Sequence, residues 1–171
     1  YVMRGSVSLS YSCGSVTGDG SVGGFVGSAS CDDGTTTSIE NCYCVGAVAS
    51  EESKSMAGGF AGYMRKHTGN VVISKCYAFG SLSSKVKGFT TKESVGNIVD
   101  CVWRRDDNGT NEDNSDGRGI QAFTTEQFSD PGMFGGMGWN IYDAESIWSY
   151  SAETGLRRPH LNGLPVINET R

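Results

Sequence analysis

A short internal repeat is the strongest constraint on how this chain of 171 residues can fold. In each of the first three copies an apolar residue lies four positions before a Tyr, and a Gly lies three positions after it. Successive Tyr residues are 32 positions apart (Tyr11 to Tyr43) and then 34 (Tyr43 to Tyr77). The copies are residues 7–16, 39–48, 73–82 and, interrupted by Arg104 and Arg105, 98–103. Such a period predicts a repeat architecture in which each copy buries its apolar residues against the next.

A second short block, rich in Gly and built around a Phe, follows each of the first three copies. The blocks are residues 22–27, 56–62 and the reduced 86–89, and insertions of variable length separate them from the first pattern. We therefore expect two recurring short strands per copy, joined by loops of free length. In the third copy Thr90-Thr91 replaces the final apolar-Gly pair, which puts its second strand in doubt.

Alternation along the first strand assigns its residues to two faces, because neighbouring side chains of a strand point in opposite directions. Small or apolar residues flank the Tyr and suit a narrow interior, whereas the Tyr itself belongs to the other face. Three columns follow: Val7, Ile39, Ile73 and Ile98; Cys42, Cys76 and Cys101; and Tyr11, Tyr43 and Tyr77. We predict an all-β protein, a parallel β-solenoid (β-helix) of about three to four coils.

The composition changes after the repeat, and two regions are expected: repeats over 1–105, and a polar loop with an aromatic-rich capping region over 106–171. Thr124 and Gln127 match a capping box, which predicts a short helix, and Pro131 limits it to a turn or two. A solenoid exposes an apolar end that an atypical terminal unit must cover. We expect this irregular tail to be that cap.

Charge and hydropathy exclude two classes of partner. The net charge is −5 and the basic residues are scattered, whereas nucleic-acid binding needs a basic field. No apolar run approaches the roughly 18 residues of a membrane span. The sequence begins inside a repeat-like segment, so we expect it to be part of a longer chain.

Catalytic motifs are scarce. His67 and His160 are the two histidines, and neither lies in an H-E-x-x-H zinc motif. No G-x-S-x-G elbow occurs, although the members of a Ser-His-Asp triad need not be close in sequence. We expect no catalytic and no metal-binding residue here.

The six cysteines do not have the spacing of zinc pairs. Cys is small and buries easily, so unpaired thiols in a column are favoured over cross-links. A disulfide joining Cys13 to Cys31, or Cys13 to Cys44, is the alternative.

Two patterns suggest ligand sites, but a simpler structural explanation is favoured for each. Glu112, Asn114 and Asp116 are spaced like calcium ligands, but Phe123 stands where an EF-hand loop needs its Glu, so a solvated loop is favoured. The column of Tyr11, Tyr43 and Tyr77 could stack on sugar rings, whereas stacking between copies is the simpler reading.

Residues 5–18, continuing to Gly24-Phe25-Val26-Gly27 and matched by Gly59-Phe60-Ala61-Gly62, resemble the GLUG-motif repeat. The resemblance covers roughly residues 5–103. The tail also resembles the ending seen after such repeats, in residues 124–128, 138–141, 147–148 and 158–161.

The resemblance implies a bacterial surface or secreted protein, since GLUG repeats occur in large adhesin-like proteins and in some immunoglobulin A-specific metallopeptidases. We expect a non-catalytic structural or adhesive segment, extracellular or at the cell surface, with a host glycan or a host or cell-surface protein as partner. The alternative is an accessory region of a secreted metallopeptidase or glycan-processing enzyme whose catalytic domain lies outside this chain.

Overall fold

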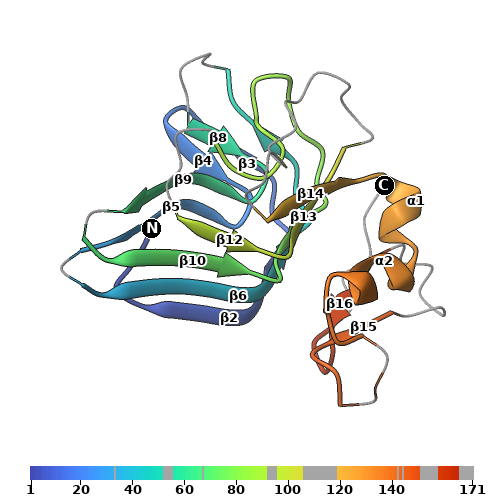
Figure 1. The fold of residues 1–171 in the computed structure, drawn as a ribbon. Helices are drawn as coiled ribbons and strands as arrows, with labels where there is room; N and C mark the ends of the chain where they lie inside the picture. The colour runs from blue at the N-terminus through green and yellow to red at the C-terminus, as the bar shows by residue number, and fades with distance from the viewer. Residues whose placement is uncertain are drawn as a thin grey trace.

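Short strands, most of them paired in parallel, are the main secondary structure of the protein (Figure 1). The computed structural model describes residues 1–32, 34–51, 56–66, 68–91, 96–105, 119–141, 143, 145–150 and 158–165. The strands of the repeat region are β1 (Val2–Met3), β2 (Ser6–Ser12), β3 (Val16–Thr17), β4 (Ser21–Gly23), β5 (Val26–Cys31), β6 (Thr36–Cys44), β7 (Val48–Ala49), β8 (Met56–Gly58), β9 (Ala61–Lys66), β10 (Asn70–Ser74), β11 (Tyr77–Ala78), β12 (Asn97–Val99) and β13 (Cys101–Arg104). The tail adds β14 (Ile120–Phe123), α1 (Thr125–Phe128), α2 (Pro131–Gly136), β15 (Trp148–Ser149) and β16 (His160–Leu161). The expected all-β character is confirmed.

The largest sheet stacks the same segment of successive repeat copies. Its strands β2, β6, β10 and β12 lie one above the other and pair in parallel (Figure 1). The register places Val7 beside Ile39, then Ile39 beside Ile73. It continues from Ile73 to Ile98. Ile39 and Ile73 are completely buried, so this apolar column forms one wall of the interior.

Each copy turns a corner at the same repeat position, two residues before the position of the Tyr column. The corner residues are Leu9, Asn41, Lys75 and Asp100, with φ of 50°, 51°, 48° and 52°. This left-handed conformation is unfavourable for most side chains and least so for Asn, Asp and Gly. The recurrence of one strained conformation at four equivalent positions shows that the copies share a backbone path.

Beyond the corner, the largest sheet continues as a second wall. Tyr43 of β6 pairs with Tyr77 of β11, and Tyr77 pairs with Val102 of β13. β14 then adds one more parallel strand and places Ile120 beside Cys101. The stack therefore gains a strand that the repeat pattern does not predict.

Three smaller parallel sheets accompany the largest one. They join β1, β5 and β9, β4 and β8, and β3 and β7. The Phe residues of the Gly-rich block, Phe25, Phe60 and Phe89, stack with 4.9 Å between successive ring centroids. A Cβ at Gly24 would lie 2.5 Å from the carbonyl oxygen of Gly59, so the repeated Gly is needed for this close backbone approach.

The reduced block of the third copy keeps its place in the stack. Gly58 forms a parallel bridge with Lys87, and the ring of Phe89 lies within 5° of parallel to that of Phe60. Thr91 is buried and donates a hydrogen bond from Oγ1 to the carbonyl oxygen of Gly62, at 3.0 Å. The segment follows the path of the earlier copies without forming a named strand.

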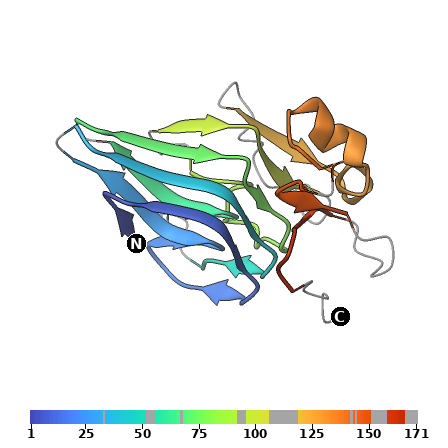
Figure 2. The same ribbon diagram turned by 90° about the horizontal axis from the view of Figure 1, so that it is seen from below.

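The tail packs along the side of the stacked strands, where α1, α2 and β15 lie in both ribbon views (Figure 2). The expected capping box at Thr124 is present, and Gln127 completes it. Pro131 does end α1, but it also begins α2, a helix that the sequence did not predict. β14 of the tail pairs along the last repeat strand and adds Ile120 to the interior cluster, whereas the tail's aromatic residues contact the outward Tyr column.

Candidate functional site

The Tyr column is the candidate binding feature that the sequence singled out. The rings of Tyr11 and Tyr43 stack with centroids 5.3 Å apart, and those of Tyr43 and Tyr77 with centroids 5.0 Å apart and planes 9° apart. The column arises because the parallel register brings the same repeat position of β2, β6 and β11 side by side. Stacking between copies, the simpler reading, is the arrangement found.

The tail covers most of this column. The indole of Trp148 lies 6.0 Å from the ring of Tyr43 and 5.7 Å from that of Tyr77, between centroids. Tyr43 and Tyr77 are completely buried, whereas Tyr11 is half-buried. The two inner rings therefore offer no open face to a sugar, and the sugar-stacking reading is corrected to a packing role for them.

Polar contacts fix the tail on the column. The hydroxyl of Tyr77 donates to the carbonyl oxygen of Pro159 at 2.5 Å and accepts from Nη1 of Arg158 at 3.2 Å. Burial raises the pKa of Tyr77 strongly, and it also raises that of Tyr43. Both phenols therefore remain protonated, and the hydroxyl of Tyr77 is the one of the two that hydrogen-bonds to the tail.

The corner residues of the repeat also anchor the tail. Nε1 of Trp148 donates to Oδ1 of Asn41 at 3.2 Å, and Nε1 of Trp139 donates to the carbonyl oxygen of Asp100 at 3.0 Å. The ammonium group of Lys75 donates to the carbonyl oxygen of Gly138. Neither the corner nor its contacts with the tail can be predicted from the sequence, because only Asn41 and Asp100 are residue types that favour a left-handed corner.

Cys42, Cys76 and Cys101 form the second column, and all six cysteines are unpaired thiols. The proposed pairings of Cys13 with Cys31 or Cys44 are not formed. Each column thiol donates to the carbonyl oxygen two residues earlier, at 3.2, 3.1 and 3.4 Å in chain order.

Burial also lowers the acidity of two of these thiols, Cys44 and Cys76. It raises the pKa of Cys76 well above the ordinary value for a thiol, and it raises that of Cys44 too. The thiolate is the nucleophilic and metal-binding form of cysteine. These side chains are therefore protonated packing groups rather than reactive ones.

The remaining candidates form no site in the part of the chain that the structure describes. Glu112, Asn114 and Asp116 of the suggested calcium loop, and His67, lie outside the described residues. Phe123 is buried in β14. His160 is buried, and its pKa is lowered first by burial and then by the charge of Arg158. Among described residues, no three His, Cys, Asp or Glu side chains are grouped to hold a metal ion.

Comparison with known proteins adds no relative: no protein-family model, no curated protein and no solved structure matches the chain. Within the described ranges, no helix has the length and hydropathy to cross a bilayer. The resemblance to the GLUG-motif repeat rests on the residues quoted for it above, and the role that it implies is a proposal.

Proposed function

We propose that the chain is a non-catalytic structural or adhesive segment, a parallel β-solenoid that spaces or presents a binding region of a secreted or cell-surface bacterial protein. The supporting observation is the common register of the repeat copies. Val7, Ile39, Ile73 and Ile98 form one continuous column, and the Phe and Tyr columns follow the same order.

The parallel walls suit a rigid rod-like role. Inside them, one apolar cluster runs from Val22 and Ile39 through Phe60 and Ile73 to Trp103. Burying an apolar side chain stabilises a protein by roughly 1.5–3 kcal/mol, so a continuous core along the stacking axis resists local opening. Repeat proteins derive such stability from contacts between neighbouring units.

Four groups capable of chemistry are used in packing. The thiols of Cys44 and Cys76 and the phenols of Tyr43 and Tyr77 are buried and protonated, which supports a role without catalysis. The second candidate function, an accessory region of a secreted metallopeptidase or glycan-processing enzyme, has the same support in this chain. It places the catalytic domain elsewhere.

Binding and hydrolysis assays on the purified chain test this proposal. A glycan array and pull-downs with host-surface proteins separate an adhesive segment, which retains affinity, from a passive spacer, which does not. Hydrolysis of a peptide or glycan substrate by the chain would contradict the proposal. A Tyr11→Ala variant is the informative control for sugar binding, because Tyr11 is the one member of the Tyr column that is not completely buried.

A further inference from the structure

The Cys column brings three thiols together in the interior. The parallel pairing of β6 with β11 makes Cys42 and Cys76 neighbours, and the pairing of β11 with β13 does the same for Cys76 and Cys101. All three side chains are completely buried. Cys76 is therefore the central member of the column, with one thiol on each side.

The three side chains share one conformation. In chain order, each thiol contacts the carbonyl oxygen two residues earlier, at 3.2, 3.1 and 3.4 Å. Each also contacts the carbonyl oxygen of the apolar column residue in the preceding copy, at 3.8, 3.6 and 3.6 Å. The thiol of Cys76 is within hydrogen-bonding reach of both Cys42 and Cys101. The three sulfur atoms thus repeat along the stacking axis.

The spacing of the strands suits a bond between neighbours but not between the outer members. Adjacent strands are about 4.8 Å apart, within the roughly 4.4–6.8 Å between Cα atoms that a disulfide spans. Cys42 and Cys101 are two strands apart, about 9.6 Å, which is too far for a disulfide. Any disulfide within the column must therefore include Cys76.

Cys42 and Cys76 differ in acidity. The pKa of the Cys42 thiol is lowered, chiefly by a hydrogen bond from the Cys76 thiol and against the opposing effect of burial. Burial raises the pKa of Cys76. The thiolate is the form of cysteine that reacts with oxidants, so Cys42 is the attacking thiol of the pair and Cys76 its protonated neighbour.

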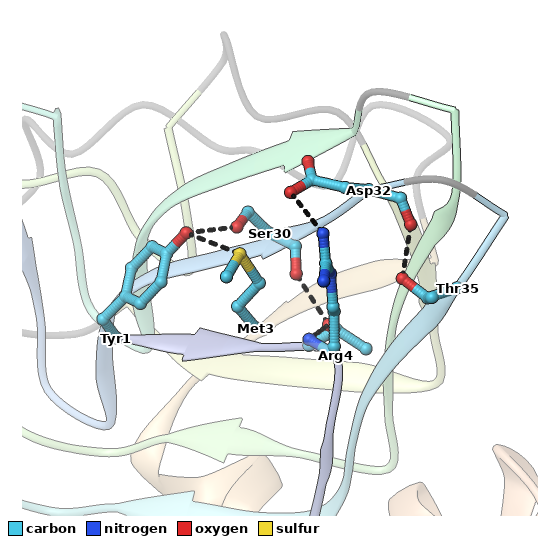
Figure 3. Close-up of polar contacts among 7 residues, drawn as sticks. Tyr1, Met3, Arg4, Ser30, Asp32 and Thr35 are labelled. Carbon is cyan, nitrogen blue, oxygen red and sulfur yellow. Dashed lines mark hydrogen bonds and ion pairs between the residues drawn. The ribbon is translucent and has the colours of Figure 1, made fainter.

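The first copy takes no part in the column, because Ser10 pairs with Cys42 at this position. The Ser10 hydroxyl donates to the carbonyl oxygen of Ser8 at 2.8 Å, the same local contact that the column thiols make. Polar side chains join this level of the stack to the next one, as between the Arg4 guanidinium and the Asp32 carboxylate, 3.4 Å apart (Figure 3). Serine thus fits the column position and gives a matched substitution for each cysteine.

We propose that the Cys column is a redox-sensitive modification site, at which a peroxide links Cys42 to Cys76 by a disulfide that staples the second copy of the repeat to the third. The two residues are neighbours in register, their sulfur atoms are within reach of each other, and both lie inside the stack. This inference rests on the geometry of the column, and it does not depend on the proposed function.

The oxidation consists of two displacements. The Cys42 thiolate attacks one oxygen of the peroxide, which forms an S–O bond, breaks the O–O bond and leaves a sulfenic acid. The sulfur of Cys76 then attacks the sulfenic sulfur, which forms the S–S bond and displaces hydroxide. Two electrons pass from the two thiols to the peroxide. With hydrogen peroxide, the two thiol protons and the two hydroxide ions give two molecules of water.

The third thiol is placed to move the bond. Thiol–disulfide exchange proceeds by attack of one sulfur on another, with the third sulfur leaving on the far side. Because the sulfur atoms repeat along one axis, Cys101 lies across Cys76 from Cys42 and can take over the bond to Cys76. The column then holds one disulfide at a time, and Cys76 is always part of it.

Disulfide mapping of the whole chain tests the proposal. Cys13→Ser removes the exposed thiol and serves as the parent for all variants. This protein is treated with hydrogen peroxide, digested without reductant and analysed by mass spectrometry. We expect a cross-linked pair of peptides containing Cys42 and Cys76, which dithiothreitol separates. Column thiols that stay reduced, become sulfinic acids without a cross-link, or pair with Cys31 or Cys44 would overturn the proposal.

Matched serine substitutions identify the two partners. Cys42→Ser and Cys76→Ser should each abolish the column disulfide. Cys44→Ser is the control and should leave it unchanged, because Cys44 is also buried but has Ser12 and Ala78 as its in-register neighbours. An undiminished yield of column disulfide in either of the first two variants would contradict the assigned roles.

Cys101→Ser keeps the test decisive if substitution of Cys42 or Cys76 prevents folding. It retains both partners and removes the exchange, so Cys42–Cys76 should be its only column disulfide. Failure of the folded variant to form this bond overturns the proposal. Oxidation should also raise its urea midpoint, because the link restricts the unfolded chain, and dithiothreitol should reverse the rise. An unchanged midpoint in the cross-linked variant would contradict the stapling.

Discussion

The indole of Trp103 occupies the space that a side chain on Gly88 would need: a Cβ at Gly88 would lie 2.2 Å from Cε2 of Trp103. The preceding copies have a small residue, Ala78 or Cys44, at the position of Trp103. There, the space above each Gly-rich block is filled by the Gly-rich block of the next copy. Trp103 thus ends the interior stack with one aromatic side chain in place of another Gly-rich block.

This relationship predicts that Gly88→Ala is destabilising by about 1–3 kcal/mol, because the indole must move in a packed interior. Trp103→Ala should cost about 3–5 kcal/mol through the cavity it leaves. In the Trp103→Ala background, Gly88→Ala should cost far less, since its clash has been removed. Urea unfolding of the four proteins measures this coupling.

Gly14→Ala is the matched control, since a Cβ there would have no neighbour within 4 Å. It should change the free energy of unfolding by less than about 0.5 kcal/mol, as surface substitutions usually do. Additive effects of Gly88→Ala and Trp103→Ala would show that the two residues do not share this space.

The corner at Leu9 predicts a stabilising substitution. Leu9 is 52% exposed and has a φ of 50°, so it has little burial to lose and a strained backbone to relieve. Leu9→Asn, which places at this corner the residue type found at Asn41, should raise the free energy of unfolding by about 1 kcal/mol. Urea midpoints of the two proteins, with Leu9→Ala as control, test this. A lower midpoint for Leu9→Asn than for Leu9→Ala would contradict it.

The burial of the thiols predicts their reactivity. Cys13 is exposed and the other five cysteines are buried. Titration of the native protein with a disulfide reagent should therefore show one fast thiol, and all six should react in denaturant. Cys13→Ser should remove the fast phase. A second fast thiol in the native protein would contradict the burial of the other five cysteines.

Alkaline pH should destabilise the fold. Burial raises the pKa of Cys44, so the folded thiol stays protonated, whereas the unfolded thiol ionises near its ordinary pKa of about 8.5. The folded state then binds more protons, and the free energy of unfolding falls as the pH rises above that value, by up to about 1.4 kcal/mol per pH unit for each such thiol.

Cys44→Ala tests the contribution of one thiol, because the next copy has Ala78 at this position. Urea unfolding between about pH 8 and pH 10 should show a shallower fall of the free energy of unfolding with pH for Cys44→Ala than for the unmodified protein. The difference in slope is up to about 1.4 kcal/mol per pH unit, which corresponds to one proton. Identical slopes would mean that the Cys44 thiol ionises in the folded state as readily as in the unfolded one.

The repeat made much of the architecture predictable. The spacing of Val7, Ile39 and Ile73 was enough to anticipate which residues lie side by side, because equivalent positions of parallel copies pair in register. The capping box at Thr124 was readable because its two bonds are local in sequence.

The rest depended on contacts that no local pattern encodes. Trp148 meets Asn41 across 107 positions, and nothing in the repeat fixes where the tail lies. The sequence alone therefore does not predict that the Tyr column is covered, whereas in the structure the tail buries Tyr43 and Tyr77. The left-handed corner was hidden because Leu9 and Lys75 are not residue types that favour it.

Methyl NMR of isoleucine-labelled protein tests the central claim, the parallel in-register stacking of the copies, most directly. Neighbouring strands lie about 4.8 Å apart, so methyl groups one strand apart give strong nuclear Overhauser effects. We predict cross-peaks between Ile39 and Ile73 and between Ile73 and Ile98, and a weak or absent one between Ile39 and Ile98. A direct contact between Ile39 and Ile98, or no contact of either with Ile73, would contradict the stacked repeat.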